Sequence, residues 1–494
     1  MNVRYYLIIG VFINFLSIHT TSQSETSTRH WQDRLISPRP DPLLVAPPDL
    51  INGRILPDAS KMPDCRTTNV IDKELTLEIV IDMALCNNTQ VRSTWVQIKS
   101  QAAAKGVARS SYLPVVVGSV GQSKDRTVSS DPLSPVNNNI TSPTSYANLT
   151  WRLFDFGGRA ANNEAASALL DSALLSHDAA IQKTLAITIS SFYETQMAKI
   201  VAQSKLLDEK NSMQLLETVK RREKSGSSSL SDVMRAQTNA NKASLERARA
   251  KGIYEKSLLT LIYNIGGTND HFKTTSITGD LSEITAPAQA VPQIRTDLKE
   301  WLTDIKRRHP AILAAQKQVL AADQKITSIR SEYMPTVDLT GNYFKNGRPN
   351  QSLTSVPTSE TLVAITLNIP IFDGFSKSYQ IQNALALAEQ KKIDLIEVEH
   401  MVLTEFLKSY SDFEVALETN LSSESLLKNA QKSLDSMQRK LESGASDLTE
   451  VLIAQSALAD ARQQRIQTLA ELRSARLRLF ANSATLGRTQ SRTQ

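Results

Sequence analysis

Cysteine and histidine are the side chains whose chemistry can be judged first from their number and spacing. The sequence has only two cysteines, Cys65 and Cys86, and six histidines scattered over 494 residues. There is no CxxC pair, and the histidines do not fall at the short spacings that bind zinc. We also find no nucleophile motif and no phosphate-binding loop. The sequence therefore predicts no cofactor, no metal site and no enzymatic activity.

The two cysteines leave two interpretations open. In an exported chain an even pair suggests a disulfide between Cys65 and Cys86. Closing such a loop would stabilise the fold by roughly 3 kcal/mol in the chain-entropy model. The alternative is one exposed and one buried thiol.

The N-terminal segment predicts export. Residues 1–22 contain Arg4, a short apolar run from Leu7 to Ile18 and then small polar residues, which is typical of a secretory signal. An uncleaved anchor is the alternative, although the apolar run is short for a membrane span. Residues 23–72 hold seven prolines without apolar periodicity. They predict an extended leader rather than a domain.

The rest of the chain contains one pattern twice. The repeated motifs are Tyr112-Leu113-Pro114 and Tyr333-Met334-Pro335, then Leu153-Phe154-Asp155-Phe156-Gly157 and Ile371-Phe372-Asp373-Gly374-Phe375, then Ser225-Gly226 and Ser443-Gly444. Their offsets are about 218 to 221 residues and their order is kept. This period is far longer than that of solenoid repeats, so the repeated unit is half of the molecule.

Each half contains very long segments of good helix formers. Residues 159–265 have no proline and are interrupted mainly at Gly226, and the second half predicts helices over 376–442 and 447–479. The part of the first segment that precedes Gly226, about sixty residues, would rise about 90 Å as a single helix. The break at each Ser-Gly pair predicts an antiparallel helical hairpin. Shorter helices are expected over 75–109 and from 294 through 310.

Each half also contains two segments with strand-like alternation, joined by a polar loop. The segments are 115–126, 144–153, 336–343 and 362–371, with loops at 128–143 and 345–359. They predict two β-hairpins of a kind that fits a membrane. Four strands cannot close a membrane barrel, and open edges are not tolerated in lipid. A transmembrane role therefore requires several chains.

The predicted fold is mainly α, with a contribution to a transmembrane β-barrel from a duplicated half-molecule. The expected organisation is a signal peptide (1–22), a Pro-rich leader (23–72), a first repeat (73–265), a connector (266–293), a second repeat (294–481) and a tail (482–494). The net charge of +6 is spread along the chain. This favours solvated helix faces over a nucleic-acid-binding surface.

In these motifs the chain resembles the TolC-like outer-membrane efflux and secretion channels of Gram-negative bacteria. The resemblance covers roughly residues 75–481 and rests on the Tyr-x-Pro ends, the Phe-Asp strand exits and the Ser-Gly turns in their duplicated order. It implies a homotrimer with a barrel in outer-membrane lipid and an α-helical tunnel through the periplasm. It also implies two partners at the tip of the tunnel, a periplasmic adaptor and an inner-membrane ABC or proton-driven pump.

The resemblance further implies an export function without catalysis. Cys65 and Cys86, just before the first helix, are similar in position to cysteines of members paired with type I protein secretion. Partners of small-molecule efflux pumps share the same fold. The cargo therefore stays open between the two.

The resemblance implies that acidic residues just beyond the helical turns line a periplasmic aperture. Asp232 and Glu450 stand six residues past the turn glycines, with Asp447 nearby. In a trimer they would form rings of carboxylates, which select cations and oppose closure. The alternative is that they are helix caps or first-turn acids. Ser446 and Leu441 replace a basic and an aromatic residue of some members, which predicts a different latch or a looser gate.

Two further groups of residues receive expected roles. The candidates for adaptor contact are the turn residues Ser225, Gly226, Ser227, Ser443, Gly444 and Ala445. Their alternative role is turn geometry alone, because glycine tolerates positive φ. The expected barrel-to-tunnel corners are Pro114, Asp155, Gly157, Pro335, Asp373 and Gly374, with the two aspartates as helix caps.

Aromatic residues near the predicted strands form a last group. Trp151, Tyr146, Tyr343 and Phe344 are expected either in a girdle at the membrane interface or in packing between neighbouring chains. An exported coiled-coil scaffold or adhesin is the competing function, because it too needs long helices. The duplicated hairpins argue against it, since a tether has no use for them.

Overall fold

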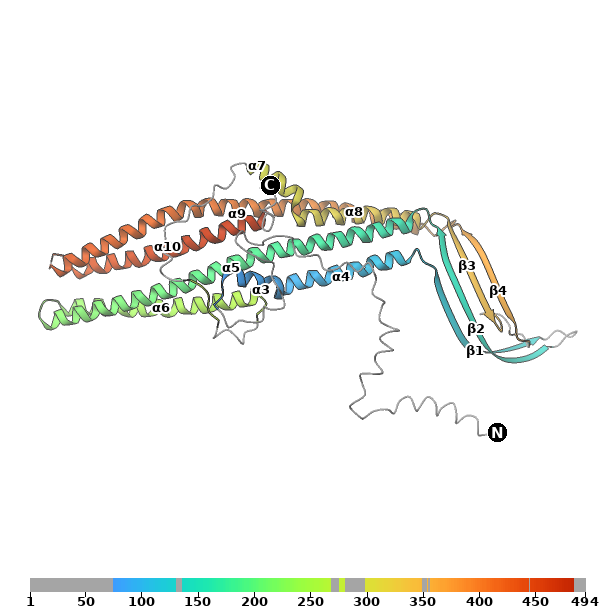
Figure 1. Ribbon diagram of the computed structural model, residues 1–494, viewed down its shortest axis with the longest axis horizontal. Coiled ribbons are helices and arrows are strands. Elements are labelled where there is room, and N and C mark those ends of the chain that lie inside the picture. Colours follow the sequence, from blue (N-terminus) through green and yellow to red (C-terminus); the bar gives the residue numbers. More distant parts are fainter. Residues whose placement is uncertain are drawn as a thin grey trace, which may run out of the picture. The chain divides into compact units, whose positions relative to one another are not determined.

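The computed structural model describes residues 74–129, 136–267, 275–279, 298–348, 353, 356–443 and 445–483. The predicted signal peptide, leader and most of the tail lie outside these residues. The described part consists of long helices and one four-stranded antiparallel sheet (Figure 1).

The duplication is visible in the lengths of the helices. The first half contains α3 (Leu77–Asn87), α4 (Thr89–Ser110), β1 (Val115–Ser129), β2 (Val136–Phe154), α5 (Gly158–Lys224) and α6 (Leu230–Asn264). The second half contains α7 (Leu298–Arg308), α8 (Pro310–Ser331), β3 (Thr336–Lys345), β4 (Ser359–Asn368), α9 (Ser376–Glu442) and α10 (Leu448–Asn482). In both halves the four helices have 11, 22, 67 and 35 residues. The predicted duplication of a half-molecule is confirmed.

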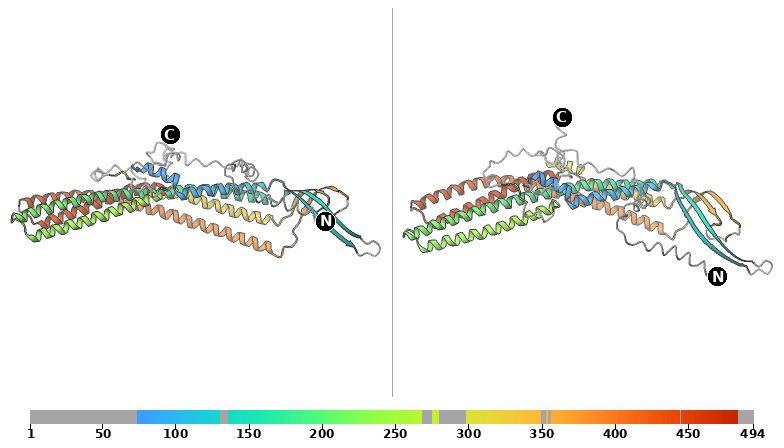
Figure 2. Two further views of the ribbon diagram at one scale, coloured as in Figure 1. Left: turned by 90° about the horizontal axis from the view of Figure 1, so that it is seen from below. Right: turned by 60° about the horizontal axis from the view of Figure 1, so that its bottom comes forward.

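The two longest helices form the helical body. At 67 residues each, α5 and α9 are about 100 Å long. After the turns that begin at Ser225 and Ser443, α6 and α10 run back beside them, as Figures 1 and 2 show and as the sequence predicts. Helix α5 contacts α3, α4, α6, α8 and α10. It is therefore the element that joins the two halves.

The helices before each hairpin are broken, which the sequence did not predict. The side chain of Asn88 accepts the backbone N–H of Gln90 at 2.8 Å and so caps α4. In the second half, Nδ1 of His309 accepts the backbone N–H of Ala311 at 3.3 Å, ahead of a helix that starts at Pro310. The continuous helix expected over 75–109 is wrong, because a capping side chain competes with the helical hydrogen bonds.

The sheet has the order β1-β2-β3-β4. The predicted polar loop 128–143 is wrong for most of its length, because 136–143 pair with 122–129 as an extension of the first hairpin. Polar strands are stable there, since the ladder satisfies their backbone groups. Pro143 lies where β2 has a partner on one side only, and proline is tolerated at such an edge.

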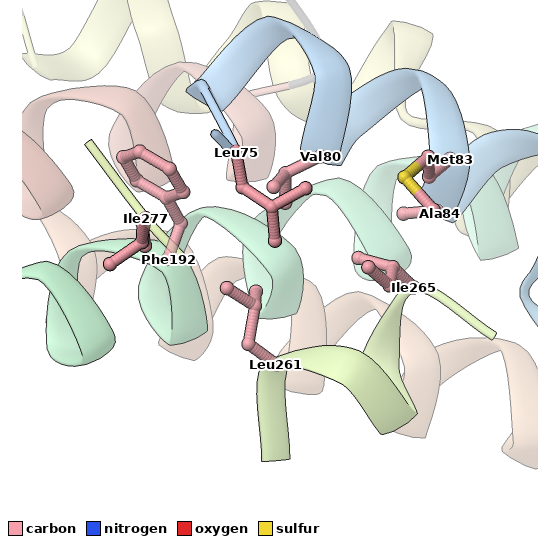
Figure 3. Close-up of a cluster of buried hydrophobic side chains, with 8 residues drawn as sticks. All are labelled: Leu75, Val80, Met83, Ala84, Phe192, Leu261, Ile265 and Ile277. Carbon is pink, nitrogen blue, oxygen red and sulfur yellow. The ribbon is translucent and has the colours of Figure 1, made fainter. Parts of the chain in front are cut away.

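The apolar core is a series of small clusters along the helices. In one of them Leu75, Val80, Met83 and Ala84 pack against residues of α5 and α6 (Figure 3). Ile277, from the segment between the two halves, joins this cluster and forms a β-bridge with Leu75. A short piece of the connector is thereby fixed against the middle of the helical body.

Truncating a residue of this cluster should destabilise the helical body. Leu261 is fully buried, so Leu261→Ala is expected to lower the free energy of unfolding by about 2 to 5 kcal/mol. The matched control is Leu259→Ala on the same helix, where the side chain is 38% exposed. Chemical denaturation in detergent measures both. Equal losses for the two variants would contradict the assignment of the core.

His309 should make stability depend on pH. Burial lowers the pKa of His309 from 6.5 to about 4. The folded protein thus keeps the ring neutral while the unfolded chain protonates it, so stability is lost as pH falls from about 6.5 toward 4. His309→Asn can still cap α8 but cannot titrate, so its thermal midpoint should vary less over this interval. An unchanged pH dependence in the variant would refute this role.

Candidate functional site

The two faces of the sheet differ in chemistry. Directly paired residues share a face, so the register assigns each residue to one of them. We call apolar face the one that carries Val116, Leu149, Trp151, Phe154, Val337, Leu339, Tyr343, Val363, Ile365 and Leu367. We call polar face the one that carries Tyr146, Asn148, Thr150, Arg152, Asp338, Thr340, Asn342, Phe344 and Thr366, although Val115, Val117 and Leu362 also lie on it.

On β4 the apolar face is the more exposed one. Val363 and Ile365 are 69% and 70% exposed, whereas Leu362 on the polar face is 40% exposed, and Asp338 on the polar face of the central strand β3 is 9% exposed. A water-soluble sheet shows the reverse arrangement, because burying apolar area drives folding. Transmembrane strands direct apolar side chains to lipid and polar ones inward. The ten residues of β3 and of β4 also match the length of about 9 to 11 residues needed to cross a bilayer.

None of the described helices is long and apolar enough to cross a membrane.

The polar face is held together by side-chain contacts across the strands. Arg152 Nε lies 2.9 Å from Asp338 Oδ1, and Asn368 Nδ2 donates to Asp338 Oδ2 at 3.0 Å. Asn148 Nδ2 donates to Asn342 Oδ1 at 2.5 Å. These contacts link β2, β3 and β4, so both halves contribute to one continuous polar surface.

The register also divides the four predicted girdle aromatics. Trp151 and Tyr343 lie on the apolar face, where an interfacial girdle is possible. Tyr146 and Phe344 lie on the polar face, with ring centroids 6.3 Å apart. The girdle prediction is therefore wrong for these two residues. Tyr343 and Phe344 are neighbours in the chain, and successive strand residues point to opposite faces.

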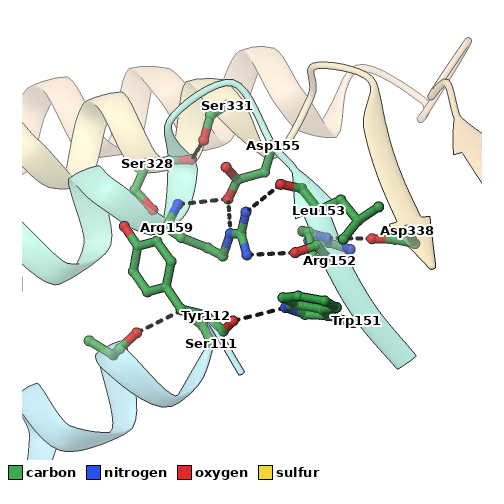
Figure 4. A network of polar contacts seen from close by, with 11 residues as sticks. Ser111, Tyr112, Trp151, Arg152, Leu153, Asp155, Arg159, Ser328, Ser331 and Asp338 are labelled. Carbon is green, nitrogen blue, oxygen red and sulfur yellow. Dashed lines mark hydrogen bonds and ion pairs between the residues drawn. The ribbon is translucent and has the colours of Figure 1, made fainter. Parts of the chain in front are cut away.

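The corner between β2 and α5 is built around Asp155 and Arg159 (Figure 4). Asp155 Oδ2 accepts two hydrogen bonds from Arg159, one from the backbone N–H at 2.8 Å and one from Nε at 3.0 Å. The guanidinium of Arg159 then donates to the carbonyls of Arg152 and Leu153 and lies 5.0 Å from the ring centre of Tyr112. The carboxylate thus satisfies a free N–H of the first helical turn, and the arginine satisfies carbonyls beside the β-bulge at the end of β2.

The corner between β4 and α9 repeats this construction. Asp373 Oδ2 accepts the backbone N–H of Lys377 at 2.9 Å. The ammonium of Lys377 lies 4.8 Å from the ring centre of Tyr333 and donates to the Tyr333 carbonyl at 3.1 Å. We call each set of tyrosine, aspartate and basic residue a corner clamp. The two basic residues were not predicted from the sequence, although an Asp-x-x-x-Arg/Lys spacing in both halves could have revealed them.

The predicted corner residues fall at these clamps. Pro114 and Pro335 directly precede β1 and β3. The two aspartates cap from two positions before the N-cap sites, which are Gly157 and Phe375. At each corner two successive residues have positive φ, Phe156-Gly157 and Gly374-Phe375. This sharp turn needs glycine at one position, and phenylalanine adopts the left-handed region at the other.

A cavity of about 650 Å³ lies beside the first clamp. Arg152, Asp155 and Arg159 line it from the first half, and Ser331, Glu332 and Asn368 line it from the second. The start of α5 approaches the end of α8 so closely that a Cβ on Gly158 would lie 2.2 Å from Ser331 Oγ. The corner is thus a joint between the two halves.

At the far ends of the helical hairpins, the predicted aperture acids take helix-capping positions. Asp232 forms a capping box with Ser229: its carboxylate accepts the Ser229 N–H at 3.0 Å, and Ser229 Oγ accepts the Asp232 N–H. Hydrogen bonds from Ser229 lower the pKa of Asp232, so this carboxylate is charged. Asp447 is the N-cap residue of α10. Glu450 is exposed, and its carboxylate accepts a hydrogen bond from Ser446 Oγ at 2.5 Å.

The two hairpin turns touch through arginines that the sequence analysis did not single out. Arg222 Nη2 donates to the carbonyl of Leu441 at 3.3 Å, and Arg235 Nη1 donates to Thr449 Oγ1 at 3.0 Å. Among the residues described, no group of three His, Cys, Asp or Glu side chains could hold a metal. The tip therefore combines exposed carboxylates with arginine contacts between the hairpins.

The predicted adaptor-contact residues are exposed and serve the turns. Ser225 Oγ donates to the Arg222 carbonyl at 2.9 Å, Gly226 has φ +78°, and the Ser227 N–H donates to the Arg222 carbonyl at 2.8 Å. In the second turn, Ser443 Oγ and the Ala445 N–H both donate to the Lys440 carbonyl. Gly444 lies outside the described residues. Cys65 does too, so its pairing with Cys86 at the end of α3 stays a prediction.

Comparison with known proteins identifies the class. The family model for outer membrane efflux proteins matches residues 80–267 and 301–484. Protein CyaE of Bordetella pertussis is 32% identical over 90% of this chain and 91% of its own. Outer membrane efflux protein BepC of Brucella suis is 24% identical over 84% of each chain. The Campylobacter jejuni CmeC outer membrane channel has the same fold, with a TM-score of 0.72 and 14% identity over 87% of this chain and 90% of that one.

The chain belongs to the outer membrane efflux protein family. It is an exit duct of the outer membrane, in which the sheet contributes to the barrel and the helices to the periplasmic tunnel. The predicted family, fold class and location are confirmed.

Removing the cation of the first corner clamp should loosen the corner. Arg159→Gln leaves the carbonyls of Arg152 and Leu153 without their charged donor, so the free energy of unfolding should fall by about 1 to 3 kcal/mol. The control is Arg249→Gln, a 63% exposed side chain paired only along its own helix, with an expected change within about 0.5 kcal/mol. Chemical denaturation in detergent separates the two. If Arg159→Gln lowers the free energy of unfolding no more than the control does, the clamp does not stabilise the protein.

Proposed function

We propose that this duct works as a homotrimer in a tripartite export system, docked to a periplasmic adaptor and an inner-membrane ABC or proton-driven pump. The observation that supports it most is the sheet, which carries a band of exposed apolar side chains on one face and a network of polar contacts on the other. The chain itself catalyses no reaction, and the pump supplies the energy. The cargo is either a protein, as in type I secretion, or small molecules.

The edges of the sheet support an assembly of several chains. In the order β1-β2-β3-β4, the outer edges of β1 and β4 have no partner strand in the part of the chain that the structure describes. Unpaired backbone groups cost several kcal/mol each in hydrocarbon, so each edge must pair with another chain. Helix α9 also favours contact with another chain, because its apolar side chains Ile393, Ile396 and Met401 are 60%, 53% and 61% exposed. A ring of three chains pairs every β1 with a neighbouring β4 and covers these side chains.

The tip of the helical body supports docking and selection. In a trimer Asp232 and Glu450 each occur three times around the axis, with Asp447 beside Glu450. Rings of carboxylates at a narrow aperture favour cations. The turn residues Ser225, Gly226, Ser227, Ser443 and Ala445 are exposed beyond them, so they are open to an adaptor. Their own hydrogen bonds hold the turns in shape for such a contact.

The second candidate function, an exported coiled-coil scaffold or adhesin, has less support. It would leave the apolar face of the sheet in water, where contiguous apolar patches are rare on soluble proteins. It also gives no role to the polar face.

Neutralising the aperture acids should change ion selectivity. Asp232→Asn plus Glu450→Gln keeps hydrogen-bonding groups at both positions but removes two charges per chain. In planar bilayers the wild type should form cation-selective channels, and the double variant should lose most of this preference. Glu255→Gln on α6 is the matched control, because this acid is far from the turns, its side chain is 47% exposed and its ion pair is with Lys251 of the same helix. Unchanged selectivity would place the constriction elsewhere, and well-folded protein that never inserts would favour the scaffold.

A further inference from the structure

The end of the second hairpin farthest from the helices carries a side-chain cluster that the proposed function does not use. Tyr146, Phe344 and Glu360 are directly paired across β2, β3 and β4, so they share the polar face. Arg348 follows β3, and its guanidinium carbon lies 5.7 Å from the ring centre of Phe344. Arg348 Nε donates to Glu360 Oε2 at 2.7 Å, and a second nitrogen contacts the other carboxylate oxygen. We call these four residues the mouth cluster.

Described residues of the connection between β3 and β4 lie toward this same face. The first hairpin extends past the second, because β2 pairs with β3 only from Ser145 onward. Asn346 Nδ2 donates to the carbonyl of Pro143 in this extension at 2.9 Å. Asp125 belongs to the polar face by the alternation of β1, and its Oδ2 accepts the N–H of Leu353 at 2.9 Å. Described residues of the connection are therefore held on the inner side of the first hairpin.

Local packing supports this inward position. Leu353 is only 8% exposed, and its Cδ2 would lie 3.3 Å from a Cβ built on Gly347. Gly347 has φ +109°, a conformation that other residues rarely adopt. Glycine at this position allows the chain to turn back over the polar face.

We propose that the mouth cluster lines a constriction at the outer opening of the duct and contacts the departing cargo there. This inference rests on the proposed function, because only a closed trimeric barrel turns the polar face into a pore wall. The ring faces of Tyr146 and Phe344 suit aromatic and cationic groups of the cargo, which bind π-systems. Arg348 is paired with Glu360, so the constriction discriminates by size and by contact with the aromatic rings rather than by a net charge of this ion pair.

Size exclusion in single channels tests this inference. Polyethylene glycols of graded size, added on the side of the bilayer that faces the strand connections, lower the conductance only when they enter the pore. The double variant Tyr146→Ala plus Phe344→Ala should admit larger polymers from that side, with unchanged cation selectivity. The matched control is Tyr343→Ala, which removes the neighbouring aromatic on the apolar face and should leave the size limit as in the wild type.

Two results would overturn the inference while leaving the duct intact: a size limit that the double variant does not change, or one that Tyr343→Ala changes equally. Arg348→Gln is a second, milder variant, since it removes the contacts with Phe344 and Glu360 but keeps both rings, and it should also raise the limit. An unchanged limit in this variant counts against the cluster. Wild-type protein that forms no channel overturns the proposed function as well.

Discussion

The structure depends on the requirement that backbone polar groups be paired in a medium without water. An unpaired N–H or C=O in hydrocarbon costs several kcal/mol, and a four-stranded sheet leaves two rows of them at its edges. The sheet of one chain is therefore incomplete. The proposed assembly, closure with copies of itself inside lipid, would cover both its exposed apolar face and its edges. The ladder of β3 and β4 is about as long as a strand that crosses the hydrocarbon layer. The first hairpin extends beyond the end of this ladder with polar residues.

Closure in lipid requires a firm link between the sheet and the helices, and the two corner clamps provide it. Both use a tyrosine two residues after the end of the incoming helix, an aspartate two residues before the N-cap and a basic residue four positions after the aspartate. They differ in the cation. Strand β2 ends in a bulge that leaves carbonyls to be satisfied, and the forked guanidinium of Arg159 reaches two of them. Lys377 has one carbonyl to satisfy, for which a single ammonium is sufficient.

The helical body is held by many small contacts instead of one core. Adjacent acids on α5 bind different partners: Asp208 pairs with Arg462 of α10, and Glu209 pairs with Arg247 of α6. Within the second hairpin, Arg465 is 1% exposed and donates to the side chain and carbonyl of Asn420. Such polar pairs specify which faces of long, repetitive helices meet. Alanine and leucine patterns alone would allow several registers.

The sequence by itself determined the elements whose causes are local. Unbroken runs of helix formers set the length of α9, predicted at Ser376–Glu442 and found there, and the Ser-Gly pairs set the positions of the turns. Duplicated motifs determined that the chain is two copies of one unit. Only the tertiary structure decided which residues meet. The strand register placed Tyr146 and Phe344 on the polar face, and folding brought Arg159 to Tyr112 and Arg235 to Thr449. Helix propensity and turn chemistry act over a few residues, whereas register and contacts between elements depend on how separate segments pack together.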